Sequence, residues 1–168
     1  VTGVIALATF AASAEPPPPN LALSARAAAT SEYSDQYRAQ FAVDGKIPGA
    51  GLQDDAGQAW CVQGNTHRNG AELTLEWPAP VTVTEVVYYG RTAWFAEECW
   101  KDCEVLVNGA PTPLARATLR MGHGPQRLQL AHPVNTQRLT LRFTGSYGGL
   151  NPGAAEVQVY ARPLLDSF

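Results

Sequence analysis

The chain has 168 residues, a formal net charge of −3, 45% hydrophobic residues and 16% charged residues. Its length suits one domain with a tail, and its hydrophobic content is sufficient for a core. The 12 Lys and Arg residues are scattered, which argues against the clustered positive charge that nucleic-acid binding requires. We therefore expect no nucleic-acid partner. No apolar run is long enough to predict a transmembrane helix.

The first residues resemble a secretory signal. Residues 4–11 are apolar and residues 12–14 are small, as in the hydrophobic region and cleavage site of a signal peptide. The usual basic residues are missing and the chain begins with Val1, so the start is truncated, misassigned or alternative. We expect a signal peptide over residues 1–14, with a disordered apolar tail as the alternative. The Pro-rich residues 15–20 predict a stiff spacer. With a signal peptide, we expect the protein to be secreted, extracellular or periplasmic.

The segment after the spacer has little helical periodicity. Residues 21–27 alternate loosely and are a candidate first strand. Residues 35–43 are the one segment that predicts a short helix, with Ser34 or Asp35 as its N-cap. Residues 45–59 are polar, rich in glycine and long for a purely connecting loop.

From residue 71 onward the hydrophobic pattern has period two. The strand candidates are residues 71–77, 81–89, 103–107, 127–130, 138–143 and 156–160. In the first of them, Leu73, Leu75 and Trp77 fall on one face. Asn108-Gly109 is a hairpin signal. Short strands joined by Gly, Pro and Asn turns predict an all-β fold, an antiparallel β-sandwich with one short helix near the N-terminus.

Several motifs follow one another in an order that resembles a known family. They are Ala42-Val43-Asp44-Gly45, Trp60-Cys61-Val62, Leu73-Thr74-Leu75-Glu76-Trp77, Val86-Val87-Tyr88-Tyr89-Gly90-Arg91, Lys101-Asp102-Cys103-Glu104-Val105 and Ala155-Glu156-Val157-Gln158-Val159-Tyr160. Together they resemble the discoidin domain, also called the coagulation factor type C domain. That domain is a galactose-binding-like jelly roll of lectins, clotting factors and sugar-binding modules of secreted glycosidases. The resemblance implies such a domain over residues 21–162, followed by a tail of residues 163–168.

The resemblance also implies a structural calcium ion. In the sugar-binding branch of the family, the metal lies between the loop after the first strand and the last strand. The matching ligands here are the side chains of Asp44 and Glu156 and the carbonyls of Phe41, Lys46 and Ala155. Such oxygens are the ligands that calcium prefers.

One departure from the family bears on this metal. The family usually has a Thr or Ser ligand shortly before the Trp, whereas Gln58 and Ala59 precede Trp60 here. Asp54 or Asp55 could substitute, or the site could be lost. The alternative is that the carboxylate of the Asp-Gly pair caps a turn and the Glu of the last strand is solvated.

Ligands of the family bind in loops at one rim of the sandwich. In residues 91–100, Trp94, Phe95 and Trp100 stand where turns are usually polar, and Arg91 accompanies them. Aromatic rings stack on sugar rings and a charged group can bind their hydroxyls. The alternative is that these aromatic residues plug the end of the sandwich.

Two further loops supply polar candidates. Tyr147 and Asn151 lie in the glycine-rich loop before the last strand, where glycine allows close backbone approach. His67 lies in the polar loop of residues 64–70, for which a solvated loop is the alternative.

The cysteines leave the disulfide question open. Cys61, Cys99 and Cys103 cannot all pair within one chain, and either Cys99–Cys103 or Cys61–Cys99 is conceivable in a secreted protein. No paired motif of histidines and cysteines supports zinc.

No catalytic motif is apparent, because a Gly-x-Ser-x-Gly elbow, a P-loop and a His-Glu-x-x-His sequence are all missing. We therefore predict a secreted, non-catalytic module that binds carbohydrate through its aromatic loop, its partner being a glycan or glycoconjugate. One alternative is an adhesion module that binds protein or the phospholipid headgroups of a membrane surface. Another is a structural domain, or enzyme subunit, of a larger assembly.

Overall fold

The computed structural model describes residues 15–164, so the expected signal segment, residues 1–14, lies outside the described residues. The elements, with η for 3-10 helices, are η1 (Leu21–Ser24), β1 (Arg26–Ala29), η2 (Ala39–Val43), β2 (Trp60–Cys61), α1 (Gly64–His67), β3 (Ala71–Gly90), η3 (Ala96–Glu98), β4 (Trp100–Val107), β5 (Ala115–Thr118), β6 (Gln126–Ser146) and β7 (Gly153–Tyr160). Within residues 15–164, no helix is long and apolar enough to span a membrane.

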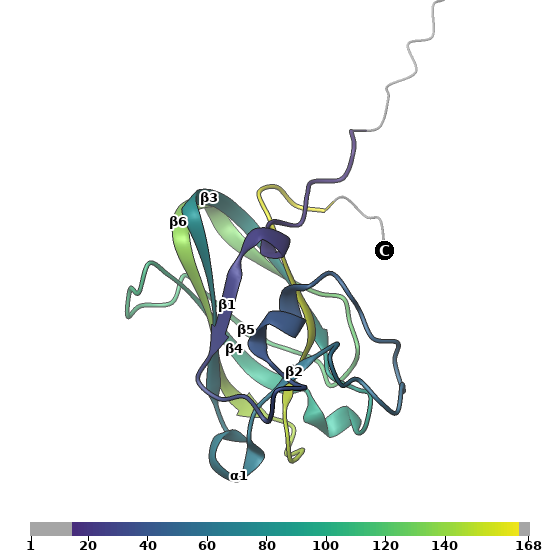
Figure 1. Ribbon diagram of the computed structural model, residues 1–168. Coiled ribbons are helices and arrows are strands. Elements are labelled where there is room, and N and C mark those ends of the chain that lie inside the picture. Colours follow the sequence, from purple (N-terminus) through teal and green to yellow (C-terminus); the bar gives the residue numbers. More distant parts are fainter. Residues whose placement is uncertain (1–14, 165–168) are drawn as a thin grey trace, which may run out of the picture.

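The strands form a sandwich from one continuous sheet. Their order is β2-β7-β3-β6-β4-β5, with β1 added to β3, and the pairings are antiparallel. Register shifts interrupt the β3–β6 pairing between Glu76 and Val81 and between Val83 and Glu85. The first half of β3 therefore pairs with β1 and the second half with β7, so the long strands pass from one layer to the other. Figure 1 shows β3 and β6 curving together at one end. The predicted antiparallel β-sandwich is confirmed.

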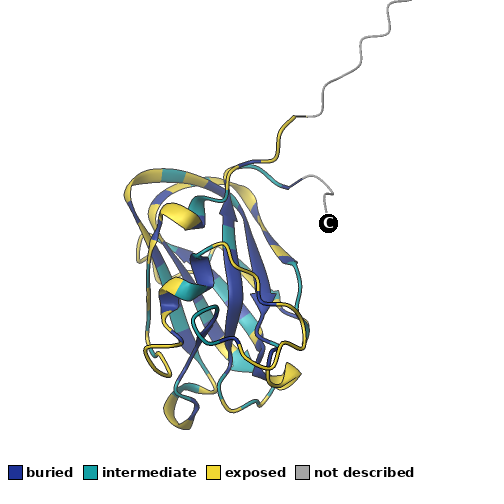
Figure 2. Ribbon diagram, turned by 45° about the vertical axis from the view of Figure 1, so that its right-hand side comes forward, coloured by how far each residue is buried: buried dark blue, intermediate teal, exposed yellow. Residues whose placement is uncertain are grey.

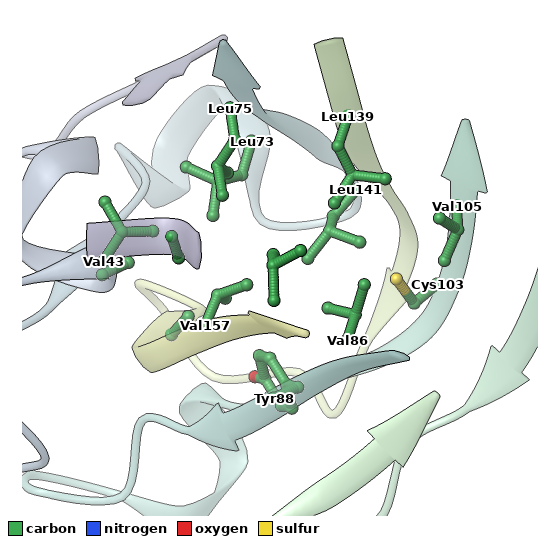
Figure 3. Packing of buried hydrophobic residues seen from close by; sticks show 14 of the residues in the cluster. Val43, Leu73, Leu75, Val86, Tyr88, Cys103, Val105, Leu139, Leu141 and Val157 are labelled. Carbon is green, nitrogen blue, oxygen red and sulfur yellow. The ribbon is translucent and has the colours of Figure 1, made fainter. Parts of the chain in front are cut away.

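Apolar side chains from both layers meet in one core. Leu73, Leu75 and Trp77 alternate with more exposed residues along β3, and each is at most 5% exposed. Leu139 and Leu141 of β6 belong to the same cluster, and in Figure 3 the labelled side chains of the cluster converge between the strands. Figure 2 shows that buried residues follow the strands, whereas the loops at the ends are largely exposed. The alternation in the sequence thus gave the correct inward face.

The predicted turn at Asn108-Gly109 is also present. Asn108 has φ of 50° and Gly109 has φ of 71°, and the Ala110 N–H donates to the Val107 carbonyl at 2.9 Å. Positive φ at both central positions matches the twist of antiparallel strands, which is why Asn-Gly is favoured there.

The N-terminal elements differ from the sequence predictions. The expected strand over residues 21–27 begins only at Arg26, because residues 21–24 form η1, whose first turn is capped by the Asn20 side chain. The expected helix over residues 35–43 is reduced to η2, since Arg38 has extended backbone angles. The Ala39 N–H donates to Glu32 Oε1 at 2.8 Å. That side-chain acceptor replaces the carbonyl of a preceding helical turn.

The chain after β7 is held by a buried charged pair. Glu85 is fully buried, and its carboxylate accepts from Arg127 Nε at 2.5 Å and from the Leu164 N–H at 2.9 Å. Arg127 also donates to the Leu164 carbonyl. Both backbone groups of Leu164 are therefore bound, and its side chain lies in a small apolar cluster with Val87 and Tyr89.

We predict that Glu85→Ala lowers the free energy of unfolding by about 2 kcal/mol, because it removes the acceptor of the Leu164 N–H and one acceptor of Arg127. Urea titration of the wild type and the variant measures the loss. Glu76→Ala is the control, because Glu76 and Arg138 form a pair in which both side chains are about half exposed, and exposed pairs contribute little. Equal midpoints for the two variants would contradict the role of Glu85.

Candidate functional site

The loop between β3 and β4 forms the wall of a shallow hollow. The hollow has a volume of about 300 Å³ and is lined by Tyr33, Tyr37, Cys61, Arg91, Trp94, Phe95, Glu98, Leu150 and Asn151. In Figure 1 this loop (teal) lies at the lower end of the sandwich, whereas the Pro-rich segment (purple) and the residues after β7 (yellow) lie at the upper end. The hollow is therefore at the end of the domain remote from residues 15–20 and 161–164.

Arg91 lies beneath the hollow in a network of ion pairs. Its side chain is 4% exposed. Nε and Nη2 donate to the two carboxylate oxygens of Asp55 at 2.7 and 2.9 Å. Nη1 donates to Glu98 Oε2 and, at 3.2 Å, to the Asn151 carbonyl. The guanidinium also lies 5.0 Å from the ring centroid of Tyr37. The structure thus gives Arg91 an internal role in place of the sugar contact expected from the sequence.

Burial and the neighbouring charges act in opposite directions on this network. Burial alone lowers the pKa of Arg91, but the hydrogen bonds and charge of Asp55, together with the charge of Glu98, raise it overall. Burial raises the pKa of Glu98, against the opposing effects of Arg91 and of the Asn151 N–H. The Asn151 N–H donates to Glu98 Oε1 at 3.2 Å, so both oxygens of that carboxylate have partners.

The role of Asp55 differs from the one that the sequence suggested. Asp55 is 1% exposed, and the sequence suggested Asp54 or Asp55 only as substitute metal ligands. Asp55 Oδ1 also accepts from Trp94 Nε1 at 3.1 Å, so Asp55 joins residues 45–59 to the aromatic loop. The unusual length and polarity of residues 45–59 suggested that this loop has a role, but they did not indicate that Asp55 pairs with Arg91.

Trp94 and Phe95 are exposed at the edge of the hollow. Trp94 is 48% exposed and Phe95 is 65% exposed. The hydrogen bond from Trp94 to Asp55 restrains the indole orientation. Leu150, 51% exposed, also lines the hollow. These positions are compatible with the sugar contacts expected for Trp94 and Phe95, since adjacent apolar rings at a hollow suit stacking.

Trp100 does not reach the surface. It is fully buried, and its ring stacks on Phe143 with centroids 4.9 Å apart and planes 9° from parallel. Trp60 lies on the same cluster, 6.2 Å from Trp100. Trp100 therefore packs in the core and cannot make the ligand contact expected from the sequence, because this first residue of β4 points inward.

The three polar candidates are dispersed. Asn151 lines the hollow, although its amide nitrogen already donates to the Val62 carbonyl at 3.0 Å. The Tyr147 hydroxyl donates to the Leu119 carbonyl at 2.6 Å, and His67 Nδ1 lies 2.8 Å from the Thr66 hydroxyl. Neither Tyr147 nor His67 is among the residues that line the hollow. The structure thus brings Arg91, Trp94, Phe95 and Asn151 together, without Trp100, Tyr147 or His67.

The three cysteines are buried free thiols. Neither disulfide considered from the sequence is formed. Cys61 lines the hollow, and burial raises the pKa of its thiol to about 12. Burial likewise raises the pKa of Cys99 to about 11. Cys61 therefore presents a protonated, weakly polar thiol to the hollow.

Asp44 and Glu156 come together at a second place, at the end of η2 beside β7. The Gly45 N–H donates to Glu156 Oε1 at 3.1 Å. Glu156 is fully buried, and its other oxygen, Oε2, has no hydrogen-bond partner. Burial, with the charge of Asp44 adding to it, raises the pKa of Glu156 to about 8. Asp44 Oδ2 lies 3.7 Å from Lys46 Nζ.

The carboxylates at this second place leave one buried oxygen, Oε2 of Glu156, without a hydrogen-bond partner. A buried oxygen without a partner is costly, and a metal ion would satisfy it. Among residues 15–164, no group of three or more His, Cys, Asp and Glu side chains could hold a metal. Carbonyl oxygens, such as those expected from Phe41, Lys46 and Ala155, would therefore have to complete the ligand set, as hard cations allow.

Several solved structures with a similar fold are carbohydrate-binding modules. The family 32 module of Clostridium perfringens NanJ, in complex with galactose, has a TM-score of 0.67 and 20% identity, over 83% of this chain and 95% of that one. The Clostridium perfringens module CpGH89CBM32-5, in complex with GalNAc-β-1,3-galactose, has a TM-score of 0.66 and 20% identity, over 83% and 97%. A fucose-binding module of Streptococcus pneumoniae has a TM-score of 0.64 and 18% identity, over 86% and 96%.

These likenesses define the class of fold. The chain is a galactose-binding-like jelly roll, as the motifs in its sequence implied. Residues 20–160 match a family described as a domain of unknown function, DUF7402. The chain therefore belongs to the DUF7402 family. No curated protein matches its sequence.

Proposed function

We propose that this domain is a non-catalytic carbohydrate-binding module whose ligand lies in the hollow beside Trp94 and Phe95. The observation that carries the proposal is a pair of adjacent exposed aromatic side chains at the edge of a hollow of about 300 Å³. A hollow of that size lies at the lower end of the range for small-molecule sites. It suits one or two sugar rings better than a long chain segment.

The similar solved structures support the same class of ligand. Two of them are complexes with galactose and GalNAc-β-1,3-galactose, a third is a fucose-binding module, and a chitosan-binding module from Paenibacillus of similar fold is in complex with chitotriose. The position of the hollow agrees, because it leaves the aromatic residues free to approach a glycan while residues 15–20 lie at the other end. A glycan target also fits the secreted location expected from the sequence.

We predict that Trp94→Ala raises the dissociation constant for the best glycan about tenfold, because a central aromatic contact contributes at least about 1.4 kcal/mol to binding. A glycan array identifies the ligand, and isothermal titration calorimetry measures the change. Met121→Ala is the control, since Met121 is also exposed, at 48%, and does not line the hollow. Unchanged affinity in Trp94→Ala would place the ligand elsewhere.

A membrane surface is the competing target, because exposed Trp94 and Phe95 could also insert among lipid headgroups. Sedimentation with phosphatidylcholine vesicles, with and without phosphatidylserine, tests it. Binding to vesicles but to no glycan would replace the carbohydrate proposal with the membrane one.

We further propose that Asp44 and Glu156 hold a structural calcium ion, with the carbonyls of Phe41, Lys46 and Ala155 as the remaining protein ligands. The unpartnered Oε2 of Glu156 supports this assignment. The ion would join η2 to β7, which are far apart in the sequence, and would act on stability. Its test is the response of unfolding to calcium.

A further inference from the structure

The groups in and under the hollow carry an excess of negative charge. Arg91 is paired with two carboxylates, Asp55 and Glu98, and all three side chains are at most 6% exposed. One positive and two negative groups leave a net charge of −1 at this place. In a partly dehydrated environment such a charge acts more strongly than at an open surface.

The one charged donor of this network, Arg91, is 4% exposed and pairs with two carboxylates, so it offers little to an acidic ligand. The guanidinium nitrogens of Arg91 are directed at Asp55, Glu98 and the Asn151 carbonyl. Arg91 is also the only Lys or Arg among the residues that line the hollow. An anionic sugar would therefore meet two buried carboxylates and no free cation, so the hollow disfavours uronic and sialic acids.

The aromatic rings that line the hollow can attract a positively charged ligand. Tyr33, Trp94 and Phe95 line the hollow, and each is at least 47% exposed. The face of an aromatic ring attracts cations, with Trp the strongest. The cation-binding side of Tyr37 is already occupied by Arg91 at 5.0 Å. The other three rings remain available to a cation from outside.

We propose that the hollow selects a sugar with a protonated amine, of which a glucosamine unit is the simplest example. The inference rests on the proposed carbohydrate-binding function and adds the charge of the ligand to it. The aromatic rings would contact both the apolar face of the sugar and its ammonium group. The net negative charge of the network would strengthen that contact without a direct salt bridge, because the oxygens of Asp55 and Glu98 already have partners.

The experiment compares a glucosamine trimer with its fully N-acetylated counterpart by calorimetry. The acetyl group removes the charge but also adds a methyl and a carbonyl group, so the pH and salt dependence of the preference isolates the charge. We expect the free amine to bind about tenfold more tightly at about pH 6, and the preference to disappear at about pH 9, because the amine of a sugar is less basic than that of lysine and loses its proton around neutral pH. Added salt should reduce the preference, because it screens charges. Trp94→Ala should weaken both ligands.

Glu98→Gln provides a variant test, since it removes one negative charge and keeps the side-chain size. We expect it to lose the preference for the amine while still binding the neutral trimer. If the N-acetylated trimer binds as well as the free amine in a Trp94-dependent manner, the inference fails and the carbohydrate function stands. If no glycan binds at all, the proposed function fails together with the inference. A uronic-acid oligomer that binds as tightly as glucosamine would also overturn the selectivity.

Discussion

Arg91→Met is expected to destabilise the fold by about 3–5 kcal/mol, because it removes the only cation from two buried carboxylates. Asp55 and Glu98 are at most 5% exposed, so neither can recover its lost partner from water without moving. The variant should also release residues 45–59 from the β3–β4 loop, since the Asp55–Arg91 pair connects the two. Chemical denaturation followed by circular dichroism measures the loss.

The matched control neutralises the whole network. In the triple variant Asp55→Asn, Arg91→Met, Glu98→Gln no buried charge remains, and replacing a complete buried ion pair is often nearly neutral. We expect it to recover most of the stability lost in Arg91→Met. If the single and triple variants are equally unstable, the loss comes from packing and the charge argument is wrong.

The sequence identified inward strand faces of this fold and one of its long-range contacts. Alternation placed Leu73, Leu75 and Trp77 on the inward face because a strand repeats every two residues. The Asn-Gly pair identified its turn because few residues tolerate positive φ. Asp44 and Glu156 were associated through the family resemblance, and a hydrogen bond from Gly45 to Glu156 now connects their segments.

The Asp55–Arg91 pair could not be predicted in the same way. The two residues are 36 positions apart, and Asp55 lies in a loop without periodicity. Its neighbour Asp54 has the same chemistry, so only the path of the backbone determines which carboxylate enters the interior. Loop conformations depend on such tertiary contacts, whereas strand faces follow from local alternation.

The two tryptophans of the aromatic loop show a second limit. Trp94 and Trp100 were equal candidates for ligand contact, yet one is 48% exposed and the other fully buried. The difference arises because Trp100 is the first residue of β4, and register shifts after it let its side chain enter the core although it is out of phase with the inward residues Cys103 and Val105. The boundary between loop and strand decided the role, and element boundaries are less certain than element types.

Glu156→Gln is expected to make the calcium-free protein more stable at about pH 8 and to remove its response to calcium. In the absence of calcium, burial raises the pKa of the Glu156 carboxyl in the folded protein to about 8, from an ordinary value of 4.5. The wild-type carboxyl is therefore protonated in the folded protein at pH values where the unfolded chain is ionised. Its contribution to stability is fully present below about pH 4.5 and is lost as the pH rises through about 8. The total change is about 5 kcal/mol.

The difference between wild type and Glu156→Gln isolates this effect from other titrating groups. Thermal unfolding in a chelator should show the wild type losing stability relative to the variant between about pH 5 and pH 8. Calcium should reverse the order near pH 8, because only the wild type supplies the carboxylate ligand, and the gain should grow with calcium concentration. Asp44→Asn should lose the calcium response but keep most of the pH dependence, since burial, the largest cause of the raised pKa of Glu156, remains. If calcium does not change the unfolding of the wild type near neutral pH, the calcium proposal is wrong and Glu156 is a buried protonated acid.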